Sequence, residues 1–276
     1  MVILGLSPIV HESAAGLVVD GKLVAAASEE RFTRKKNDGG FPHRSVEFCL
    51  RRAGIELSDI DHVAYAALPF SRERARDLVG YARNIAYVVS AKDAVANKLS
   101  HLLNYSRSML LHKEWTSWGK TDRHIRAELK TLGLADRLVY VDHHRAHVAS
   151  AVYSSGFDEC LGVSLDGYGS GQAGSFYLAR GGKLELLASI PYPHSLGTFY
   201  RRVTLALGFT PNRHEGKIVG LAAFGDPSRL YDEVYARFDL EHEDHFRFKS
   251  GQDPFFEKKL AAKHSREDVA AAYQRV

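Results

Sequence analysis

Short apolar runs, several of them alternating with polar residues, recur along the chain and predict β-strands. The predicted strands cover residues 2–7, 14–19, 23–28, 62–67, 137–141, 160–165, 173–179 and 184–190. Asp20-Gly21 separates the second strand from the third, and this dipeptide is typical of the tight turn of a β-hairpin. The chain therefore begins with three strands in succession.

Apolar residues spaced three and four positions apart predict helices between these strands. The predicted helices cover residues 44–53, 73–132, 195–207 and 216–224, with one more that begins at His143. Val46 and Leu50 form the inner face of the first helix, and Asp142 is a suitable N-cap for the helix that begins at His143. Residues 73–132 have the character of a helical insertion.

This order of elements predicts an α/β fold. The order is three antiparallel strands, a helix, a strand, a helix and a second hairpin. It resembles an order found in the superfamily of actin, sugar kinases, acetate kinase and heat-shock chaperone ATPases, whose lobes are ribonuclease H-like. That resemblance implies two lobes with ATP between them. We expect a first lobe over residues 1–225, and in residues 226–276 the start of the connection to a second lobe that this chain leaves incomplete.

Composition narrows the class of protein. Apolar residues make up 45% of the 276 positions and charged residues 25%, which is typical of a soluble globular protein. The formal charge of +4 is spread along the chain, so nucleic acid is not an expected partner. Without an apolar run of the roughly 20 residues that span a bilayer, and without a signal peptide, we expect a cytoplasmic protein that contacts no membrane. Cys49 and Cys160, in apolar surroundings, are expected to be reduced core residues.

The first candidate for chemistry is a pair of histidines. His143 and His147 lie four residues apart, so both imidazoles fall on one face of a helix and can share one metal ion. Fourteen histidines in this length make some pairs at any spacing expected by chance, and a solvated helix face is the alternative. Residue 144 is a histidine rather than a glutamate, so the metalloprotease pattern His-Glu-x-x-His fails, and His144 itself is expected to be structural.

Asp166 supplies a carboxylate at the end of the next apolar strand. Glycines at 167, 169 and 171 follow it, and glycines let backbone N–H groups approach phosphate oxygens closely. We therefore expect Asp166 to be a third metal ligand, and Gly167 and Gly169 to contact a phosphate-bearing cofactor. A plain Asp-Gly turn is the alternative. Two imidazoles and one carboxylate accept iron, zinc or manganese.

Two further segments are candidates for binding. Lys36 lies in a basic loop over residues 31–38, where a compact positive charge suits a phosphate or a polarised carbonyl; a solvated basic loop is the alternative. Gly216 and Gly220 fall one turn apart on a predicted helix, which predicts close backbone packing there or a functional contact.

Together these segments resemble the O-carbamoyltransferase family, which includes nodulation-factor and antibiotic carbamoyltransferases. The matching stretches are His11-Glu12-Ser13-Ala14-Ala15, Ser28 to Arg34 with Lys36, Gly40-Phe41-Pro42, Asp142-His143-His144 with His147, Leu165-Asp166-Gly167, Pro193 to Gly197, Leu207-Gly208-Phe209 and Lys217 to Gly225. A weaker similarity, centred on the His-x-x-x-His pair, extends to the tRNA threonylcarbamoyladenosine transferase.

The resemblance implies a two-step reaction. A YrdC-like domain makes carbamoyl-adenylate from carbamoyl phosphate and ATP, and the lobe pair transfers the carbamoyl group to a hydroxyl of a sugar, antibiotic or lipo-oligosaccharide. By the same resemblance, His143, His147 and Asp166 bind a divalent metal, usually iron. His11 and Lys36 contact the carbamoyl-adenylate; whether His11 takes the acceptor's proton or only orients the carbamoyl group stays open.

The chain departs from the family's pattern in three ways. Glu12 stands where aspartate is usual, and Asn37 where histidine is frequent. Family members run to roughly twice this length, so we expect an N-terminal portion that needs a second lobe and a YrdC-like domain, in cis or in trans. The alternatives are an ATP-dependent small-molecule kinase of the same superfamily, which Ser7-Pro8 in the first loop disfavours, and a non-catalytic binding module.

Overall fold

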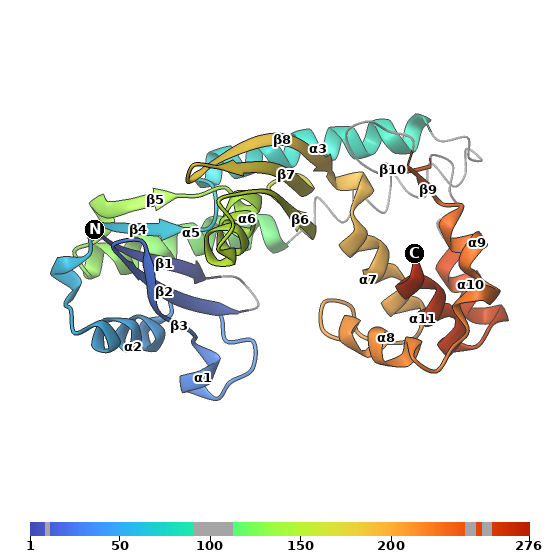
Figure 1. The fold of residues 1–276 in the computed structure, drawn as a ribbon, viewed down its shortest axis with the longest axis horizontal. Helices are drawn as coiled ribbons and strands as arrows, with labels where there is room; N and C mark the ends of the chain where they lie inside the picture. The colour runs from blue at the N-terminus through green and yellow to red at the C-terminus, as the bar shows by residue number, and fades with distance from the viewer. Residues whose placement is uncertain (9–11, 91–112, 241–246, 250–255) are drawn as a thin grey trace. The chain divides into compact units, whose positions relative to one another are not determined.

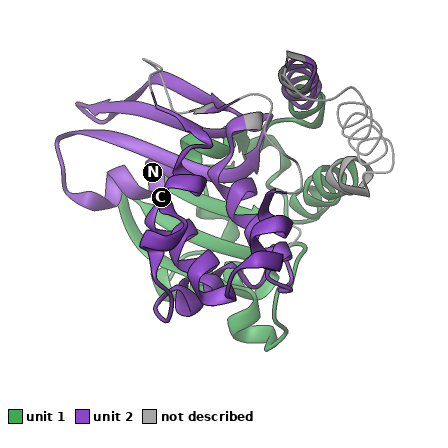
Figure 2. Cartoon of the chain, turned by 90° about the vertical axis from the view of Figure 1, so that its right-hand side faces the viewer, with its two compact units in different colours: residues 1–75, 112–146 green, residues 76–111, 147–276 purple. Residues whose placement is uncertain are grey.

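The computed structural model describes residues 1–8, 12–90, 113–240, 247–249 and 256–276, and it shows β-sheets together with helices (Figure 1). The α/β class predicted from the sequence is confirmed. Figure 2 colours two compact units: residues 1–75 with 112–146, and residues 76–111 with 147–276. Two of the boundaries between the units fall within helices, one between Ala75 and Arg76 in α3 (Phe70–Ser90) and one between Ala146 and His147 in α6 (His143–Ser155).

Unit 1 is built on a five-stranded sheet in the order β3-β2-β1-β4-β5. Its strands are β1 (Val2–Pro8), β2 (Ser13–Val19), β3 (Lys22–Ser28), β4 (His62–Tyr65) and β5 (Leu138–Tyr140). The first three are antiparallel, whereas β4 runs parallel to β1 and β5 parallel to β4. Asp20 and Gly21 both have positive φ, at 47° and 79°, so the predicted hairpin turn is confirmed.

Four helices lie between the strands of this sheet in the order of the chain: α1 (Glu30–Thr33), α2 (His43–Ala53), α3 (Phe70–Ser90) and α5 (Lys113–Thr131). The core of unit 1 joins Leu4 and Leu17 of the sheet to Val46 of α2 and Leu129 of α5. Cys49 is also in this core, and burial raises the pKa of its thiol. The predicted helix over 44–53 is confirmed, and 73–132 is helical where it is described; residues 91–112 lie outside the described residues.

A buried carboxylate ties the loop before α2 to the N-terminus of that helix. Glu29 is 6% exposed, and it accepts the N–H of Arg44 at 3.1 Å, the N–H of Ser45 at 2.8 Å and the Ser45 hydroxyl at 2.8 Å. A negative charge at a helix N-terminus is favourable because the N–H groups there lack partners within the helix. Glu29 therefore anchors the segment that leads to Lys36.

We expect Glu29→Ala to lower the free energy of unfolding by about 2–3 kcal/mol, because buried donors lose their acceptor. The measurement is the urea midpoint of the purified full-length protein. Glu47→Ala, on the exposed side of α2 with a side chain 72% exposed, is the control and should change stability little. Equal effects of the two substitutions would contradict the capping role.

Unit 2 contains a second antiparallel sheet in the order β6-β7-β8, with β6 (Glu159–Gly169), β7 (Gln172–Arg180) and β8 (Lys183–Pro191). Val148 and Val152 of α6 pack against this sheet with Tyr177 and Ala179 of β7, and partly buried Cys160 joins them.

The strands predicted over 160–165 and 173–179 leave residues 166–172 as the connection between them, and the structure differs from this prediction. The strands continue through these residues, and the β6–β7 turn itself consists of Ser170 and Gly171, both with positive φ. The extra residues form an irregularity in the pairing between Leu165 and Gly169. Asp166 therefore lies in a bulge of β6, and bulges redirect side chains.

The helices that follow β8 in the chain form a second hydrophobic core in unit 2. They are α7 (Leu196–Ala206), α8 (Glu215–Ala222), α9 (Tyr231–Tyr235), α10 (Phe256–Lys263) and α11 (Arg266–Arg275), with the short strands β9 (Phe238–Asp239) and β10 (Arg247–Phe248). Short 3₁₀ turns cover Leu57–Asp59, Ala135–Arg137, Tyr192–His194 and Pro227–Arg229. One core runs from Phe199 of α7 to Tyr273 of α11, so residues on both sides of position 225 pack together.

Close packing predicted at Gly216 and Gly220 is wrong for the part of the chain that the structure describes. A Cβ built on either would meet nothing within 4 Å. The close approach occurs instead at Gly225, where a Cβ would lie 2.1 Å from the carbonyl oxygen of Glu267 at the start of α11. The helix periodicity that suggested a packed face does not say which face is buried.

Asp268 secures the same junction. It accepts the N–H of Asp226 at 2.8 Å and the guanidinium of Arg229 at 2.9 Å, while its own N–H donates to Ser265, the N-cap of α11. The hydrogen bond from the Asp226 backbone is the largest of the interactions that lower the pKa of the Asp268 carboxyl below its usual value. The ionised form is thus favoured in the folded state.

A carboxyl whose pKa is lower in the folded state contributes stability above its unfolded pKa of about 3.9, and loses it as the pH falls through the folded value. We expect Asp268→Asn to reduce the acid-induced loss of stability below about pH 4, while lowering stability near neutral pH. Unfolding free energies measured across the acid range check this. An unchanged acid slope in Asp268→Asn would contradict it.

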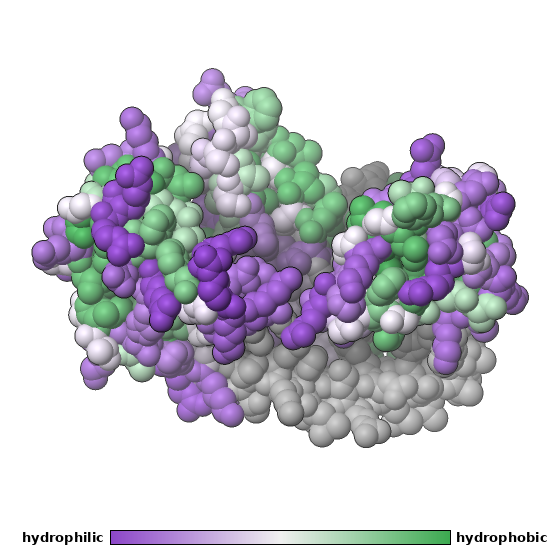
Figure 3. Space-filling view, turned by 90° about the horizontal axis from the view of Figure 1, so that it is seen from below, coloured by the Kyte–Doolittle hydropathy of each residue, from purple (hydrophilic) through white to green (hydrophobic). Residues whose placement is uncertain are grey.

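Among the described residues, no helix combines the length and the apolar composition that crossing a membrane requires. Hydrophilic residues cover much of the face shown in Figure 3, with apolar residues interspersed among them.

Candidate metal centre

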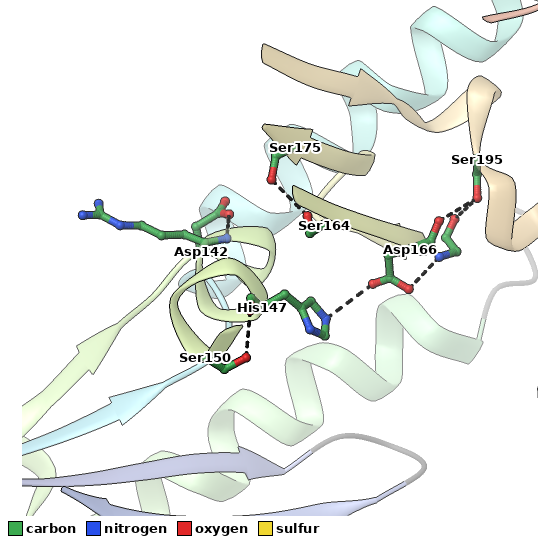
Figure 4. A network of polar contacts seen from close by, with 9 residues as sticks. Asp142, His147, Ser150, Ser164, Asp166, Ser175 and Ser195 are labelled. Atoms are coloured by element: carbon green, nitrogen blue, oxygen red, sulfur yellow. Dashed lines mark hydrogen bonds and ion pairs between the residues drawn. The ribbon is translucent and has the colours of Figure 1, made fainter. Parts of the chain in front are cut away.

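Helix α6 begins where the sequence predicts. The Asp142 carboxylate accepts the N–H of Arg145 at 3.0 Å (Figure 4). The Asp142 carbonyl accepts the N–H of Ala146 at 2.8 Å. These are the contacts of an N-cap residue, so the predicted cap is confirmed. Because the cap fixes the first turn, His143 and His147 lie one turn apart on α6.

His144 is fully buried, in contrast to its two neighbours in the motif. Its ring meets that of His143 edge to face, with centroids 5.2 Å apart. The prediction that His144 is structural agrees with this burial.

The structure brings His143, His147 and Asp166 together. One potential ligand atom from each lies within 4.8 Å of the others. In unit 2, His147 Nε2 is 3.7 Å from Asp166 Oδ2, and Figure 4 shows the imidazole pointing toward the carboxylate. The cluster therefore joins the first turns of α6 to the bulge of β6.

The geometry of the cluster fits a divalent transition metal. Ligand atoms about 2.1 Å from a tetrahedral metal are about 3.4 Å apart, close to the 3.7 Å between His147 and Asp166. The side chain of His147 is 54% exposed and that of Asp166 34%, so an ion held there would be accessible to a substrate. Three ligands with open positions are typical of a catalytic rather than a structural site.

The register between helix and strand depends on a glycine. A Cβ at Gly162 of β6 would lie 2.4 Å from Val148 Cγ1 and 2.9 Å from Val152 Cγ2. Only glycine permits this approach. Because Val148 follows His147 directly, the same contact places His147 near the end of β6 that carries Asp166.

The orientation of Asp166 is set by its own backbone. Its Oδ1 accepts the N–H of Gly167 at 2.6 Å, while Oδ2 faces His147. A Cβ at Gly197 would lie 2.6 Å from both the Cα and the N of Gly167, so the start of α7 packs directly on this residue. Gly169 is buried and pairs with Gln172. Contact of Gly167 and Gly169 with a phosphate stays a prediction.

The structure adds Ser195, which the sequence analysis did not single out. Its hydroxyl donates to the carbonyl oxygens of Asp166 at 3.0 Å and Gly167 at 2.6 Å (Figure 4). The available signal was a serine at the first position of the helix predicted over 195–207, since serine is favoured as an N-cap.

Two predicted residues remain, Lys36 and His11. Lys36 lies exposed in a turn of unit 1 after α1, next to Lys35, which pairs with Asp38 at 3.4 Å. His11 lies outside the described residues. Their contact with carbamoyl-adenylate stays a prediction.

The fold and the cluster define an α/β protein with a candidate divalent-metal centre open to small molecules. The family described as carbamoyltransferase N-terminus matches residues 2–276, so the chain belongs to that family. The resemblance predicted from the motifs is confirmed.

The relatives extend beyond the region they share with this chain. An uncharacterised protein of Synechocystis is 35% identical over 248 residues, which cover 89% of this chain and 38% of that protein. The nodulation protein NolNO of Sinorhizobium fredii is 31% identical over 232 residues, 83% of this chain and 30% of its own length. The chain thus spans about a third of the length of these two relatives.

Two solved structures align with this chain at low sequence identity. YeaZ from Pseudomonas aeruginosa aligns over 70% of this chain and 68% of its own, with 14% identity and a TM-score of 0.37. Component A of the (R)-2-hydroxyglutaryl-CoA dehydratase of Acidaminococcus fermentans aligns over 100% of this chain and 74% of its own, with 12% identity and a TM-score of 0.46.

We expect His143→Ala, His147→Ala and Asp166→Ala each to weaken the binding of Zn²⁺ or Fe²⁺ by the full-length protein. Substitutions of outer-shell residues weaken metal binding about 10- to 100-fold, and loss of a direct ligand should weaken it more. Isothermal titration and metal analysis of the purified protein provide the measurement. His124→Ala is the matched control, since His124 is a half-exposed histidine of α5, 51% exposed. Unchanged metal affinity in all three variants would rule out this centre.

Proposed function

We propose that the full-length protein containing this chain is an O-carbamoyltransferase that transfers a carbamoyl group from carbamoyl-adenylate to a substrate hydroxyl. The observation that carries the proposal is the convergence of His143, His147 and Asp166 in a chain of the carbamoyltransferase N-terminus family. Carbamoyl phosphate and ATP are the proposed substrates for forming the adenylate.

His143, His147 and Asp166 would hold the metal. When bound, the metal would supply positive charge close to the phosphate of the AMP leaving group. Fe²⁺ is the proposed ion, with Zn²⁺ or Mn²⁺ as alternatives, because imidazole and carboxylate ligands suit all three.

The transfer step exchanges one bond for another at the carbamoyl carbon. The acceptor oxygen bonds to this carbon, and the bond between the carbon and the phosphate oxygen breaks. AMP leaves with the electron pair, and His11 takes the acceptor's proton or orients the carbamoyl group. The positive charge of Lys36 would hold the phosphate. The Lys36 side chain is exposed on the turn after α1, so a ligand can reach it.

The acceptor is proposed to be a hydroxyl of a sugar, an antibiotic or a lipo-oligosaccharide. Part of the acceptor's specificity is assigned to the segment from α3 to α5, because insertions commonly carry variable function. A YrdC-like domain and a second lobe, in cis or in trans, would complete the reaction.

Incubation of the full-length protein with ATP and carbamoyl phosphate should yield pyrophosphate, inorganic phosphate and carbamoyl-adenylate. AMP is then released when the carbamoyl group passes to an acceptor hydroxyl or to water, and the products are resolved by chromatography. Formation of ADP instead would support a kinase of the same superfamily, and no nucleotide product would support a binding module. Lys36→Ala should reduce AMP formation about 100-fold or more, on the scale of losing one charge-stabilising group. Lys35→Ala, one residue away and paired with Asp38, is the control and should keep the activity.

A further inference from the structure

The peptide group between Asp166 and Gly167 is held from both ends. Its carbonyl oxygen accepts a hydrogen bond from the Ser195 hydroxyl at 3.0 Å, and its N–H donates to Asp166 Oδ1 at 2.6 Å. The C=O and N–H of one peptide lie in one plane, so fixing the carbonyl also fixes the direction of the N–H. That N–H in turn holds Oδ1, and Oδ2 is the oxygen that faces His147.

Ser195 is itself fixed in place. It is 1% exposed, and its oxygen accepts the N–H of Thr198 at 2.9 Å as the N-cap of α7. Its hydroxyl also reaches the Gly167 carbonyl at 2.6 Å, which the Thr198 hydroxyl approaches at 3.4 Å. The missing side chain of Gly197 lets α7 come this close, since a Cβ there would lie 2.9 Å from the carbonyl carbon of Asp166.

We infer that Ser195 is the positioning residue of the metal centre: through the Asp166–Gly167 peptide it directs Asp166 Oδ2 toward His147. The inference rests on the proposed metal-dependent function. A carboxylate oriented only by its own flexible side chain would lose rotamer freedom when the metal binds, whereas Ser195 removes that freedom beforehand.

The same residue links the metal centre to the helical core of unit 2. Phe199 and Val203, on the body of α7, are buried in that core, at 5% and 0% exposure. Phe199 stacks on Tyr273 of α11 with ring centroids 4.6 Å apart. The orientation of Asp166 therefore depends on where the helical core places the first turn of α7.

The test compares Ser195→Ala, Ser195→Thr and Ser175→Ala in the full-length protein. Ser175 is a matched control, because it is fully buried in the neighbouring strand and its hydroxyl pairs with that of Ser164 at 3.0 Å. Zn²⁺ affinity is measured by titration, and Co²⁺ absorption reports the ligand set without any assay of activity. Ser195→Gly is added in case the alanine variant does not fold, since glycine is a tolerated N-cap.

Ser195→Ala should weaken Zn²⁺ binding about 10- to 100-fold and alter the Co²⁺ spectrum, as loss of an outer-shell hydrogen bond does. Ser195→Thr, which keeps the hydroxyl, should restore both, and Ser175→Ala should bind like the wild type even where it lowers thermal stability.

Wild-type affinity in Ser195→Ala and Ser195→Gly would overturn the inference, as would equal weakening in Ser175→Ala. The proposed function fails in a different way. If the wild type binds no metal, or binds it as tightly after His147→Ala, the metal centre is absent; if only the Ser195 variants are unaffected, the centre stands without this positioning residue.

Discussion

The packing of α6 on β6 is the constraint on which the candidate metal centre depends. Val148 and Val152 cross the strand at Gly162, where a Cβ would lie 2.4 Å from the nearer valine methyl group. Any larger residue would push the helix away, because protein interiors leave no space for such an overlap. His147 precedes Val148 in the helix and Asp166 follows Gly162 in the strand, so this one contact sets the distance between imidazole and carboxylate.

Helical periodicity gives α6 two different faces within a few residues. His144 and Val148 lie four positions apart and are buried, at 0% and 1% exposure. His143 and His147 are displaced by one position, which is about 100° around the axis, and they face the accessible side. The two histidines of the candidate metal centre therefore belong to a helix held by its own core contacts, and rigid supporting elements favour precise metal geometry.

Much of this arrangement could be predicted because it is local. Alternating apolar residues predicted the strands of both sheets, and the Asp142 cap and four-residue histidine spacing predicted one shared helix face. The bulge at Asp166 could not be predicted, since it depends on the register between β6 and β7, which the alternation of apolar residues does not specify. The contacts of Ser195 and of Gly225 likewise depend on segments 28 or more residues away, and no spacing in the sequence records them.

The bulge explains how a strand can place Asp166 as a candidate metal ligand. In regular β-pairing, the side chains of Asp166 and its neighbours would point to alternate faces of the sheet. The backbone of Asp166 would then be paired with β7. In the irregular stretch between Leu165 and Gly169 the Asp166 carbonyl instead reaches Ser195, and the Gly167 N–H turns to the aspartate's own side chain. The carboxylate orientation thus follows from backbone contacts made within the bulge, so the position of α7 matters for the candidate centre as well as the three side chains.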